Sequence, residues 1–221
     1  VGVTPRPGFW GYLWSWLTTV DHKRIGIMYG VTTLAYLLWG GLEALLIRLQ
    51  LSRPENTFLD PNTYNQVFTM HGLTMIFLVV MGFNSTLFNL VVPLQIGARD
   101  VAYPRLNAFS YWMFLFGSVL LNLGWLWGQA PDVGWFGYAP LTGVKADPGL
   151  GPDFYVMGLQ ALGISSVAAG LNFVATIINH RAPGMSLFKM PVFTWMALLT
   201  SFLMIFALPV LAIALIVVMF D

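Results

Sequence analysis

Long apolar segments constrain this sequence more than any other feature. A membrane-spanning helix needs about 20 consecutive, mostly apolar residues. The segments that meet this requirement are residues 24–48, 66–93, 107–128, 154–178 and 191–220. Charged residues make up only 9% of the chain, against about 25% in soluble domains. The sequence therefore predicts an all-α fold, a polytopic bundle of five transmembrane helices that forms a single domain over residues 1–221.

The composition also excludes several kinds of site. The chain has no cysteine, which rules out disulfides, thiolate metal sites and iron–sulfur clusters. A net charge of +1 gives no indication of nucleic-acid binding. The first residues, VGVTPRPGFWGYLW, lack the basic segment and short apolar run of a signal peptide, so we expect no cleavage there.

Positive charges predict the orientation of the helices. If the five spans alternate in direction, the N-terminal side holds Arg6, Lys23, Arg24, Arg99, Arg105, Arg181 and Lys189. The opposite side holds only Arg48, Arg53 and Lys145. Most acidic residues lie on that second side, namely Glu55, Asp60, Asp132, Asp147, Asp153 and Asp221. We therefore expect a cytoplasmic N-terminus. Before the first span, the tryptophan-rich segment FWGYLWSWLTTVDHKR is expected at the membrane interface.

One histidine lies inside the second span, in the stretch TMHGLTMIFLVV. His71 is predicted some 7–8 Å inside the helix, where an ionisable side chain is a functional candidate. Imidazole is a common metal ligand, and haem iron accepts axial histidine. Arg48, on the same side, is positioned to meet polar haem substituents. Alternatively, His71 forms an interhelical hydrogen bond and Arg48 reaches to the interface; the pattern alone leaves both open.

Polar residues gather in the opposite membrane half. Ser165, Asn172 and Thr176 are spaced by seven and four residues, which places them on one helix face over about 16 Å. The other polar residues of this half are Tyr29, Asn84, Ser85, Thr86, Asn89, Asn107 and Ser166. Asp100 lies at the predicted mouth, where a carboxylate would attract protons to a file of water. Alternatively, the small polar residues allow close helix packing and Asp100 is a solvated acid beside Arg99.

The sequence also predicts the positions of three further ionisable residues. Glu43 lies inside the first span and is a functional candidate by default, either protonated or facing another chain. It is five residues from Arg48, so the two side chains diverge and an ion pair within the helix is not expected. His22 and His180 lie in predicted loops, and we expect both at the surface.

Several stretches match a known family, in the family's order and over nearly the whole chain. They are TTVDHKRIGIMY, LLIRLQL, YNQVFTMHG, FNLVVPLQIGARDVAYPRLNAFSYW, GWFGYAPL, GISSVAAGLNF and NHRAPGMSLFKMPVFTW. With these stretches the chain resembles the N-terminal part of subunit I of haem–copper terminal oxidases of the cytochrome c oxidase type. The resemblance is stronger to bacterial than to mitochondrial members. It implies that the five spans belong to a twelve-helix fold.

The resemblance also implies roles for individual residues. His71 would be one axial ligand of a low-spin haem, Arg48 would hydrogen-bond a haem substituent, and Trp135 would lie near the haem propionates. Asp100 would be the mouth of a proton pathway, with Asn89 and Asn107 ordering its first waters. The pathway would then be lined by Tyr29, Ser165, Ser166, Asn172 and Thr176.

The whole enzyme would draw electrons from cytochrome c, reduce oxygen to water and pump protons across a bacterial plasma membrane, with the mitochondrial inner membrane as the alternative location. The expected partners are the remaining part of subunit I, subunits II and III, cytochrome c and membrane lipid, with no nucleic acid. One alternative is a quinol-fed oxidase of the same family. Another is a non-catalytic, structural or transporter-like membrane fragment without haem.

The sequence departs from the family pattern at three points. Leu162 replaces a serine of the proton pathway, and Gln50 replaces a glutamate of a small outer cation site, which argues against that site here. The ligands of the high-spin haem and of copper belong to later helices, so none is expected in this chain. The chain alone would not reduce oxygen, and we expect it to be part of a split or truncated subunit, or a portion of a longer one.

Overall fold

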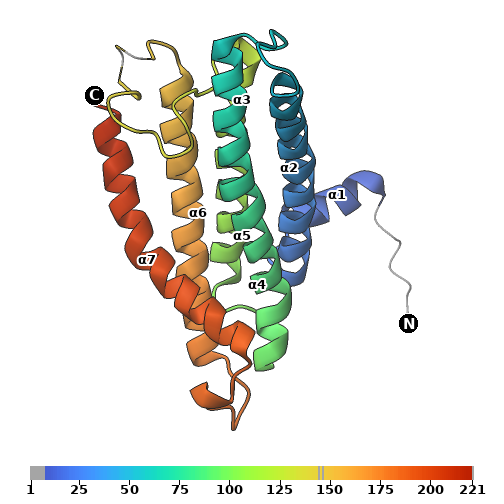
Figure 1. Cartoon of the computed structure of the whole chain (residues 1–221). Helices are drawn as coiled ribbons and strands as arrows, with labels where there is room; N and C mark the ends of the chain where they lie inside the picture. Colours follow the sequence, from blue (N-terminus) through green and yellow to red (C-terminus); the bar gives the residue numbers. More distant parts are fainter. Residues whose placement is uncertain (1–7, 144, 146, 221) are drawn as a thin grey trace.

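The computed structural model describes residues 8–143, 145 and 147–220, so Arg6 and Asp221 of the charge argument lie outside the described residues. Five helices are long and apolar enough to cross a membrane. They are His22–Gln50, Pro61–Ile96, Pro104–Trp127, Gly151–Asn179 and Val192–Val218. The described residues form helices, turns and loops and no strand. The predicted all-α architecture with five apolar spans is therefore confirmed, as in Figure 1.

The second span is a composite helix. It consists of α3 (Pro61–Leu73), a π-helical segment η1 (Thr74–Val80) and α4 (Met81–Ile96). It begins at Pro61, five residues before the predicted start. The carboxylate of Asp60 caps this end by accepting hydrogen bonds from the backbone N–H groups of Asn62 and Thr63. Proline at the first helical position also favours a helix start here. Hydropathy alone overlooks this polar first turn.

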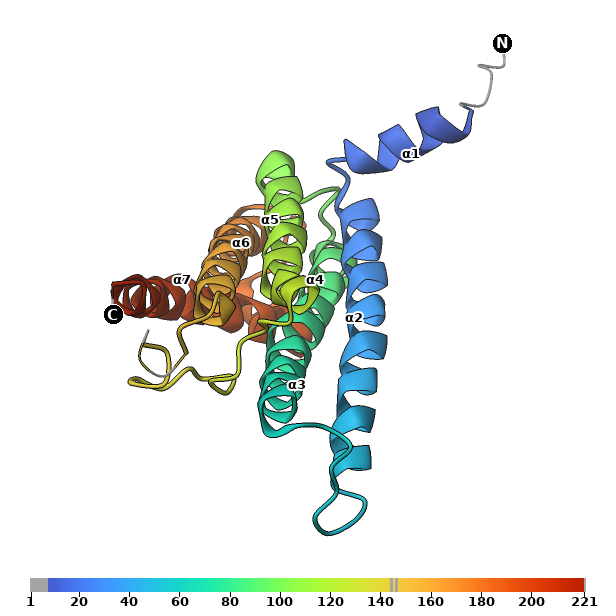
Figure 2. The same ribbon diagram turned by 90° about the horizontal axis from the view of Figure 1, so that it is seen from above.

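The remaining spans pack as neighbours around a common core. They are α2 (His22–Gln50), α5 (Pro104–Leu123) with the short turn η2 (Gly124–Trp127), α6 (Gly151–Asn179) and α7 (Val192–Val218); the turn η3 (Leu187–Lys189) precedes α7. The closest pairs are α5 with α6, α6 with α7, and α2 with α4. Seen from above, α2 and α7 lie on opposite sides of the bundle (Figure 2).

A short helix, α1 (Phe9–Leu17), projects away from the start of α2 (Figures 1 and 2). It buries none of its residues, and Phe9, Trp10 and Trp14 are exposed. The guanidinium of Arg24 lies 5.4 Å from the Trp16 ring centre, which ties the end of α1 to α2. This apolar, unburied helix suits the membrane interface, and its location there stays a prediction.

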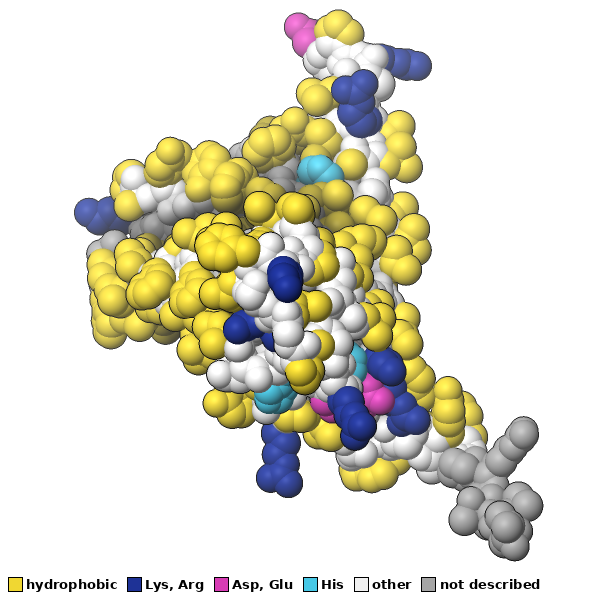
Figure 3. All heavy atoms as spheres, turned by 90° about the horizontal axis from the view of Figure 1, so that it is seen from below, with side chains coloured by type: hydrophobic (Ala, Val, Ile, Leu, Met, Phe, Trp, Pro, Cys, Tyr) yellow, Lys and Arg dark blue, Asp and Glu magenta, His cyan; other side chains and the backbone are white. Residues whose placement is uncertain are grey.

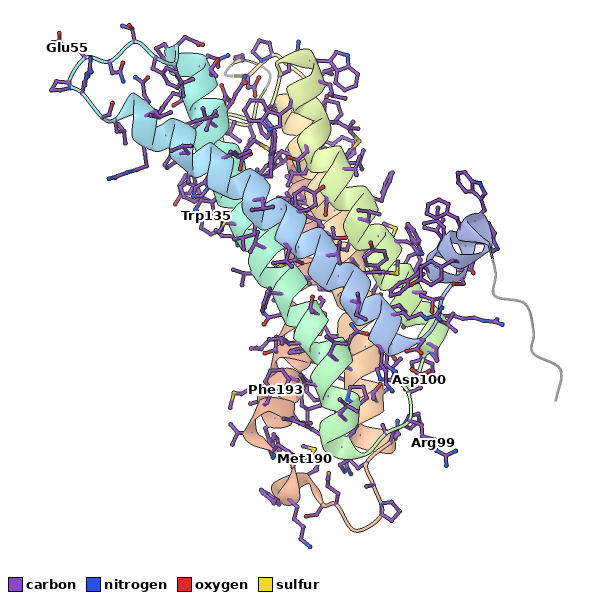
Figure 4. All side chains as sticks on the ribbon, turned by 90° about the vertical axis from the view of Figure 1, so that its right-hand side faces the viewer. Glu55, Arg99, Asp100, Trp135, Met190 and Phe193 are labelled. Atoms are coloured by element: carbon purple, nitrogen blue, oxygen red, sulfur yellow. The ribbon has the colours of Figure 1, made fainter. Side chains whose placement is uncertain are left out.

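The bundle has two ends that differ in charge. The Asp100 end contains the start of α2, the end of α4 and the end of α6; the His71 end contains the end of α2 and the start of α3. The described cations of the Asp100 end are Lys23, Arg24, Arg99, Arg105, Arg181 and Lys189. Figure 3 shows Lys and Arg side chains gathered over this end, beside histidine and acidic side chains. Figure 4 places Asp100 and Arg99 at one end, and Glu55 and Trp135 in the opposite half.

Candidate functional site

His71 is fixed by one nitrogen and free at the other. Its Nδ1 lies 2.9 Å from the backbone carbonyl oxygen of Gly40 on α2. Nδ1 must donate to this carbonyl, which places the lone pair of the neutral ring on Nε2. Nε2 makes no hydrogen bond to a described residue and is not fully enclosed by them. The interhelical hydrogen bond considered from sequence is therefore present, and it leaves the ligating nitrogen available.

The bond from His71 requires α2 to approach the π-helical segment closely. A Cβ atom added to Gly40 would lie 2.8 Å from the sulfur of Met75 and 3.2 Å from Cγ2 of Thr74. Only glycine therefore fits at this crossing without a shift of the neighbouring side chains. Met70 is fully buried and packs in the core.

Trp135 packs against Gly72, the residue that follows His71. A Cβ atom on Gly72 would lie 3.1 Å from Cβ of Trp135, so the indole covers the residue that follows the histidine. Two hydrogen bonds hold this part of the loop: Gly134 N–H donates to Thr69 Oγ1 at 3.0 Å, and the Tyr155 hydroxyl donates to the Trp135 carbonyl at 3.1 Å. The indole is 39% exposed, so one part of it stays accessible next to His71.

The sequence does not reveal Thr69 and Tyr155 as supports of Trp135. Thr69 lies two residues before His71, so its polar side chain in an apolar span could have been singled out from the sequence. Its partner Gly134 could not, because it belongs to a loop without a periodic pattern. In the same loop, burial and the nearby Asp147 carboxylate raise the pKa of Asp132 above its ordinary value. The loop is therefore a packed structure over the His71 end.

Arg48 lies at the same end but apart from His71. It is exposed in the last turn of α2, eight residues beyond Gly40 and hence about 12 Å further along the helix. It forms no ion pair with any described residue. The arginine is therefore available to a group that extends outward from His71.

Glu43 is buried between α2 and the second span. It is 2% exposed, and neither carboxyl oxygen has a hydrogen-bond partner among the described residues. It borders a half-open cavity of about 430 Å³, lined by Trp39, Leu42, Leu45, Leu46, Leu59, Thr63, Val67 and Trp125. As expected, it does not pair with Arg48.

Gln50 closes the connection between α2 and α3. Its Nε2 donates to the carbonyl of Asn56, and its Oε1 accepts the Leu59 N–H at 2.7 Å. The amide therefore uses both of its polar atoms on the loop backbone. Among the described residues, no cluster of three or more His, Asp or Glu is placed to hold a metal ion.

Asp100 opens the polar region at the other end of the bundle. Its side chain is 43% exposed, and Oδ1 accepts hydrogen bonds from Val101 N–H at 2.8 Å and from His22 Nδ1 at 2.9 Å. It does not pair with Arg99 in the described part of the chain. The expected surface position of His22 is wrong: the residue is 2% exposed, because the loop that carries Asp100 folds over the start of α2. His180 is exposed, as expected.

Two of the predicted pathway residues anchor this loop. Thr176 Oγ1 accepts the Ala102 N–H and Asn172 Oδ1 accepts the Tyr103 N–H, each at 2.8 Å. The Thr176 hydroxyl also donates to the Asn172 carbonyl at 2.6 Å. These side chains therefore position the mouth, while Nδ2 of Asn172 is buried without a partner among the described residues.

A pair of amides lies behind the mouth. Asn107 Nδ2 donates to Asn89 Oδ1 at 2.6 Å, and both residues are buried. Oδ1 of Asn107 is buried and has no partner among the described residues. A buried polar atom without a protein partner is costly unless water bonds to it. The pair is therefore suited to holding water.

A hydroxyl cluster continues from the amide pair. The Tyr29 hydroxyl donates to Ser110 Oγ at 3.2 Å, Ser110 donates to the Asn107 carbonyl at 2.7 Å, and Ser165 donates to the Ser110 carbonyl at 2.6 Å. Sequence reasoning missed Ser110, although it follows Asn107 by three residues and so shares its helix face. Ser110 connects α2, α5 and α6.

Ser166 belongs to a different space from Ser165. It borders a cavity of about 110 Å³ between α4, α6 and α7, together with Asn84, Ser85, Thr200 and Ser201. Neighbouring helix residues diverge by about 100°, which explains the separation. Leu162, at the position of the absent serine, is buried in the apolar core.

Comparison with known proteins gives consistent matches. Residues 24–221 match the family described as cytochrome c and quinol oxidase polypeptide I. The chain is 53% identical over 209 residues to cytochrome c oxidase subunit 1 of Bacillus subtilis, covering 95% of the chain and 33% of the relative. It is 48% identical over 213 residues to quinol oxidase subunit 1 of the same species (96% and 33%). It is also 48% identical over 216 residues to cytochrome bo(3) ubiquinol oxidase subunit 1 of Buchnera aphidicola (96% and 33%). The chain spans about a third of the length of these relatives.

Proposed function

The chain belongs to the subunit I family of haem–copper cytochrome c and quinol oxidases, and from this premise we propose that it forms part of the catalytic subunit of a proton-pumping terminal oxidase. Family membership supports the proposal that it is a membrane-bound oxidoreductase component of respiratory electron transport in a multi-subunit complex. The proposed reaction is the reduction of oxygen to water with electrons from cytochrome c. The other partners would be the rest of subunit I and subunits II and III, in a bacterial plasma membrane with the Asp100 end on the cytoplasmic side.

The single observation that carries this proposal is the geometry of His71. Its Nδ1 is occupied by the Gly40 carbonyl, so Nε2 presents a lone pair in a fixed direction. A hydrogen bond to the remote nitrogen is the usual support of a metal-bound imidazole. Trp135 would cover one side of the site, and Arg48 would meet a polar substituent further out.

A low-spin haem held by His71 would supply one-electron transfer. His71 would hold the group from this chain, and its other protein ligand would come from the rest of the subunit. The high-spin haem and copper of the complete enzyme would also be held elsewhere. This chain's residues would orient the low-spin group and restrict water around it.

Proton uptake would start at Asp100. From its exposed carboxylate, protons would move through water molecules held at the Asn89–Asn107 amides. They would then reach the hydroxyl groups of Tyr29, Ser110 and Ser165. The buried, unpartnered atoms of Asn107 and Asn172 support water binding along this path. Asn172 and Thr176 would hold the mouth in place, and Ser166 would contact a side cavity.

A specific observation also favours a quinol as donor. The cavity beside Glu43 is apolar, which would suit the ring of a quinol. Glu43 borders this cavity, and its buried carboxyl oxygens have no hydrogen-bond partner among the described residues. Steady-state turnover of the whole complex with reduced cytochrome c and with a quinol, measured side by side, would decide between the two donors.

The visible spectrum of the purified complex tests the haem assignment. We expect a Soret band and a low-spin signal in the natural complex, and loss of the low-spin signal in His71→Ala, because Nε2 is removed. His180→Ala, at the opposite end, is the matched control and should keep the signal. Absence of any haem band in the intact complex would instead favour a structural or transporter-like role.

A further inference from the structure

His22 is a buried imidazole at the water-facing end of the bundle. It is the first residue of α2 and is 2% exposed, whereas the Asp100 side chain that it contacts is 43% exposed. Nothing in the proposed pathway requires a histidine here. Its burial therefore asks for a separate explanation.

The contact fixes the direction of the Asp100 carboxylate. Oδ1 receives two hydrogen bonds, one from His22 Nδ1 at 2.9 Å and one from Val101 N–H at 2.8 Å. Oδ2 has no hydrogen bond to a described residue. With Oδ1 held from two directions in a side chain that is 43% exposed, Oδ2 is the oxygen left free to receive protons.

The hydrogen-bond direction at His22 follows from its partner. Nε2 is buried and has no partner among the described residues. The Asp100 carboxylate can only accept, so the proton of the contact lies on Nδ1, which donates to Asp100.

No neighbouring charge replaces His22 in this contact. The charged and titratable groups nearby are Asp21 at the N-cap of α2, Lys23 and Arg24 on α2, Arg99 in the loop, and His180 and Arg181 after α6. Arg24 bonds to Ser15, and Arg181 bonds to the carbonyls of Ile177 and Met185. In the described part of the chain, His22 is the ionisable residue whose side chain contacts the Asp100 carboxylate.

We propose that His22 is a positioning residue for proton uptake: its Nδ1–H holds Oδ1 of Asp100 so that Oδ2 stays at the mouth of the path. This inference rests on the proposed function, because it assigns His22 a role through Asp100. Without the imidazole, the carboxylate would rotate about its side-chain bonds and lose its fixed direction toward water.

The test measures proton uptake by the whole complex in vesicles. We expect His22→Ala to slow uptake about tenfold, within the range produced by misplaced catalytic groups. His22→Asn should restore most of the rate, because the amide Nδ2 takes the place of Nδ1 and donates to Asp100 without titrating. Retention of the haem spectrum in both variants shows that the fold is intact.

A double variant separates this role from a general structural one. In an Asp100→Asn background, His22→Ala should slow uptake no further, since residues that act through one another are not additive. Equal slowing in both backgrounds would overturn the proposal, as would failure of His22→Asn to restore the rate. If Asp100→Asn slows uptake and His22→Ala does not, the inference fails while the proposed pathway stands. If Asp100→Asn has no effect, the pathway itself fails.

Discussion

The two ends of the bundle use the same bond for different purposes. At the His71 end, an imidazole Nδ1 donates to a neutral backbone carbonyl at 2.9 Å; at the Asp100 end, another Nδ1 donates to a carboxylate at the same distance. The difference lies at the second nitrogen, which is open in His71 and buried in His22. An imidazole with an open Nε2 is prepared to bind a metal, whereas one with a buried Nε2 can only hold its partner.

The two ends also differ in what supplies the supporting bonds. Around His71 the supports are the Gly40 carbonyl, the Trp135 side chain and the close helix approach at Gly40, which fix the position of the imidazole ring. Around Asp100 they are hydroxyls and amides that donate and accept, which suits the movement of protons. The contrast predicts that substitutions at one end leave the process at the other end intact.

The largest effect is expected for Asp100→Asn. Proton uptake by the whole complex should fall by about 10²-fold, the scale of a lost acid–base group, because the amide does not take up a proton. Reduction of the low-spin haem by the donor should persist, since His71 lies at the opposite end. Asp153→Asn, an exposed carboxylate of the His71 end, is the control. If Asp100→Asn slowed haem reduction as much as proton uptake, the two ends would not act independently and the contrast between them would be wrong.

A smaller effect is expected at the glycine crossing. Gly40→Ala should destabilise the complex by about 1–3 kcal/mol, the typical cost of overpacking, and weaken the low-spin signal by separating α2 from His71. Gly41→Ala is the matched control, because a Cβ there meets no atom within 4 Å. Thermal unfolding followed at the haem band measures both variants. A normal spectrum and unfolding temperature in Gly40→Ala would show that the His71–Gly40 bond is not needed.

The smallest effect concerns the loop over the His71 end. The raised pKa of Asp132 means that its ionised form disfavours the folded loop. Asp132→Asn should therefore stabilise the complex at pH 7, by less than about 0.5 kcal/mol because the group is largely solvated. The gain should disappear as the pH falls through the raised pKa toward the ordinary value of 3.8, where both states bind the proton. Unfolding temperatures at pH 7 and at acidic pH test the sign, and a gain that grows on acidification would contradict it.

Much of the fold was predictable from sequence. Five apolar segments gave the spans because lipid leaves the backbone no partners outside a helix. The bounds of the second span were less predictable, since its first turn is polar and depends on the Asp60 cap. Hydropathy also gave no indication of the π-helical segment that follows His71.

The candidate site was predictable only in part. His71 and Asp100 stand out because ionisable residues in apolar surroundings are unusual. His22 was misjudged, because its burial depends on a loop 78 residues away in sequence. Ser110 was missed because its role depends on Tyr29 and Ser165, which meet it from α2 and α6. The supports of Trp135 depend on an irregular loop whose path no periodic pattern specifies.

The Gln50 side chain has a practical consequence for anyone handling this protein. The turn between the first two long helices is tied by a neutral amide, with one atom donating and the other accepting. These two hydrogen bonds involve no charged group and no bound ion, so the turn should keep its shape in high salt and in the presence of chelating agents during purification. The same turn with a carboxylate at this position would confront the Asn56 carbonyl with a second negative oxygen and would need a cation to keep its shape.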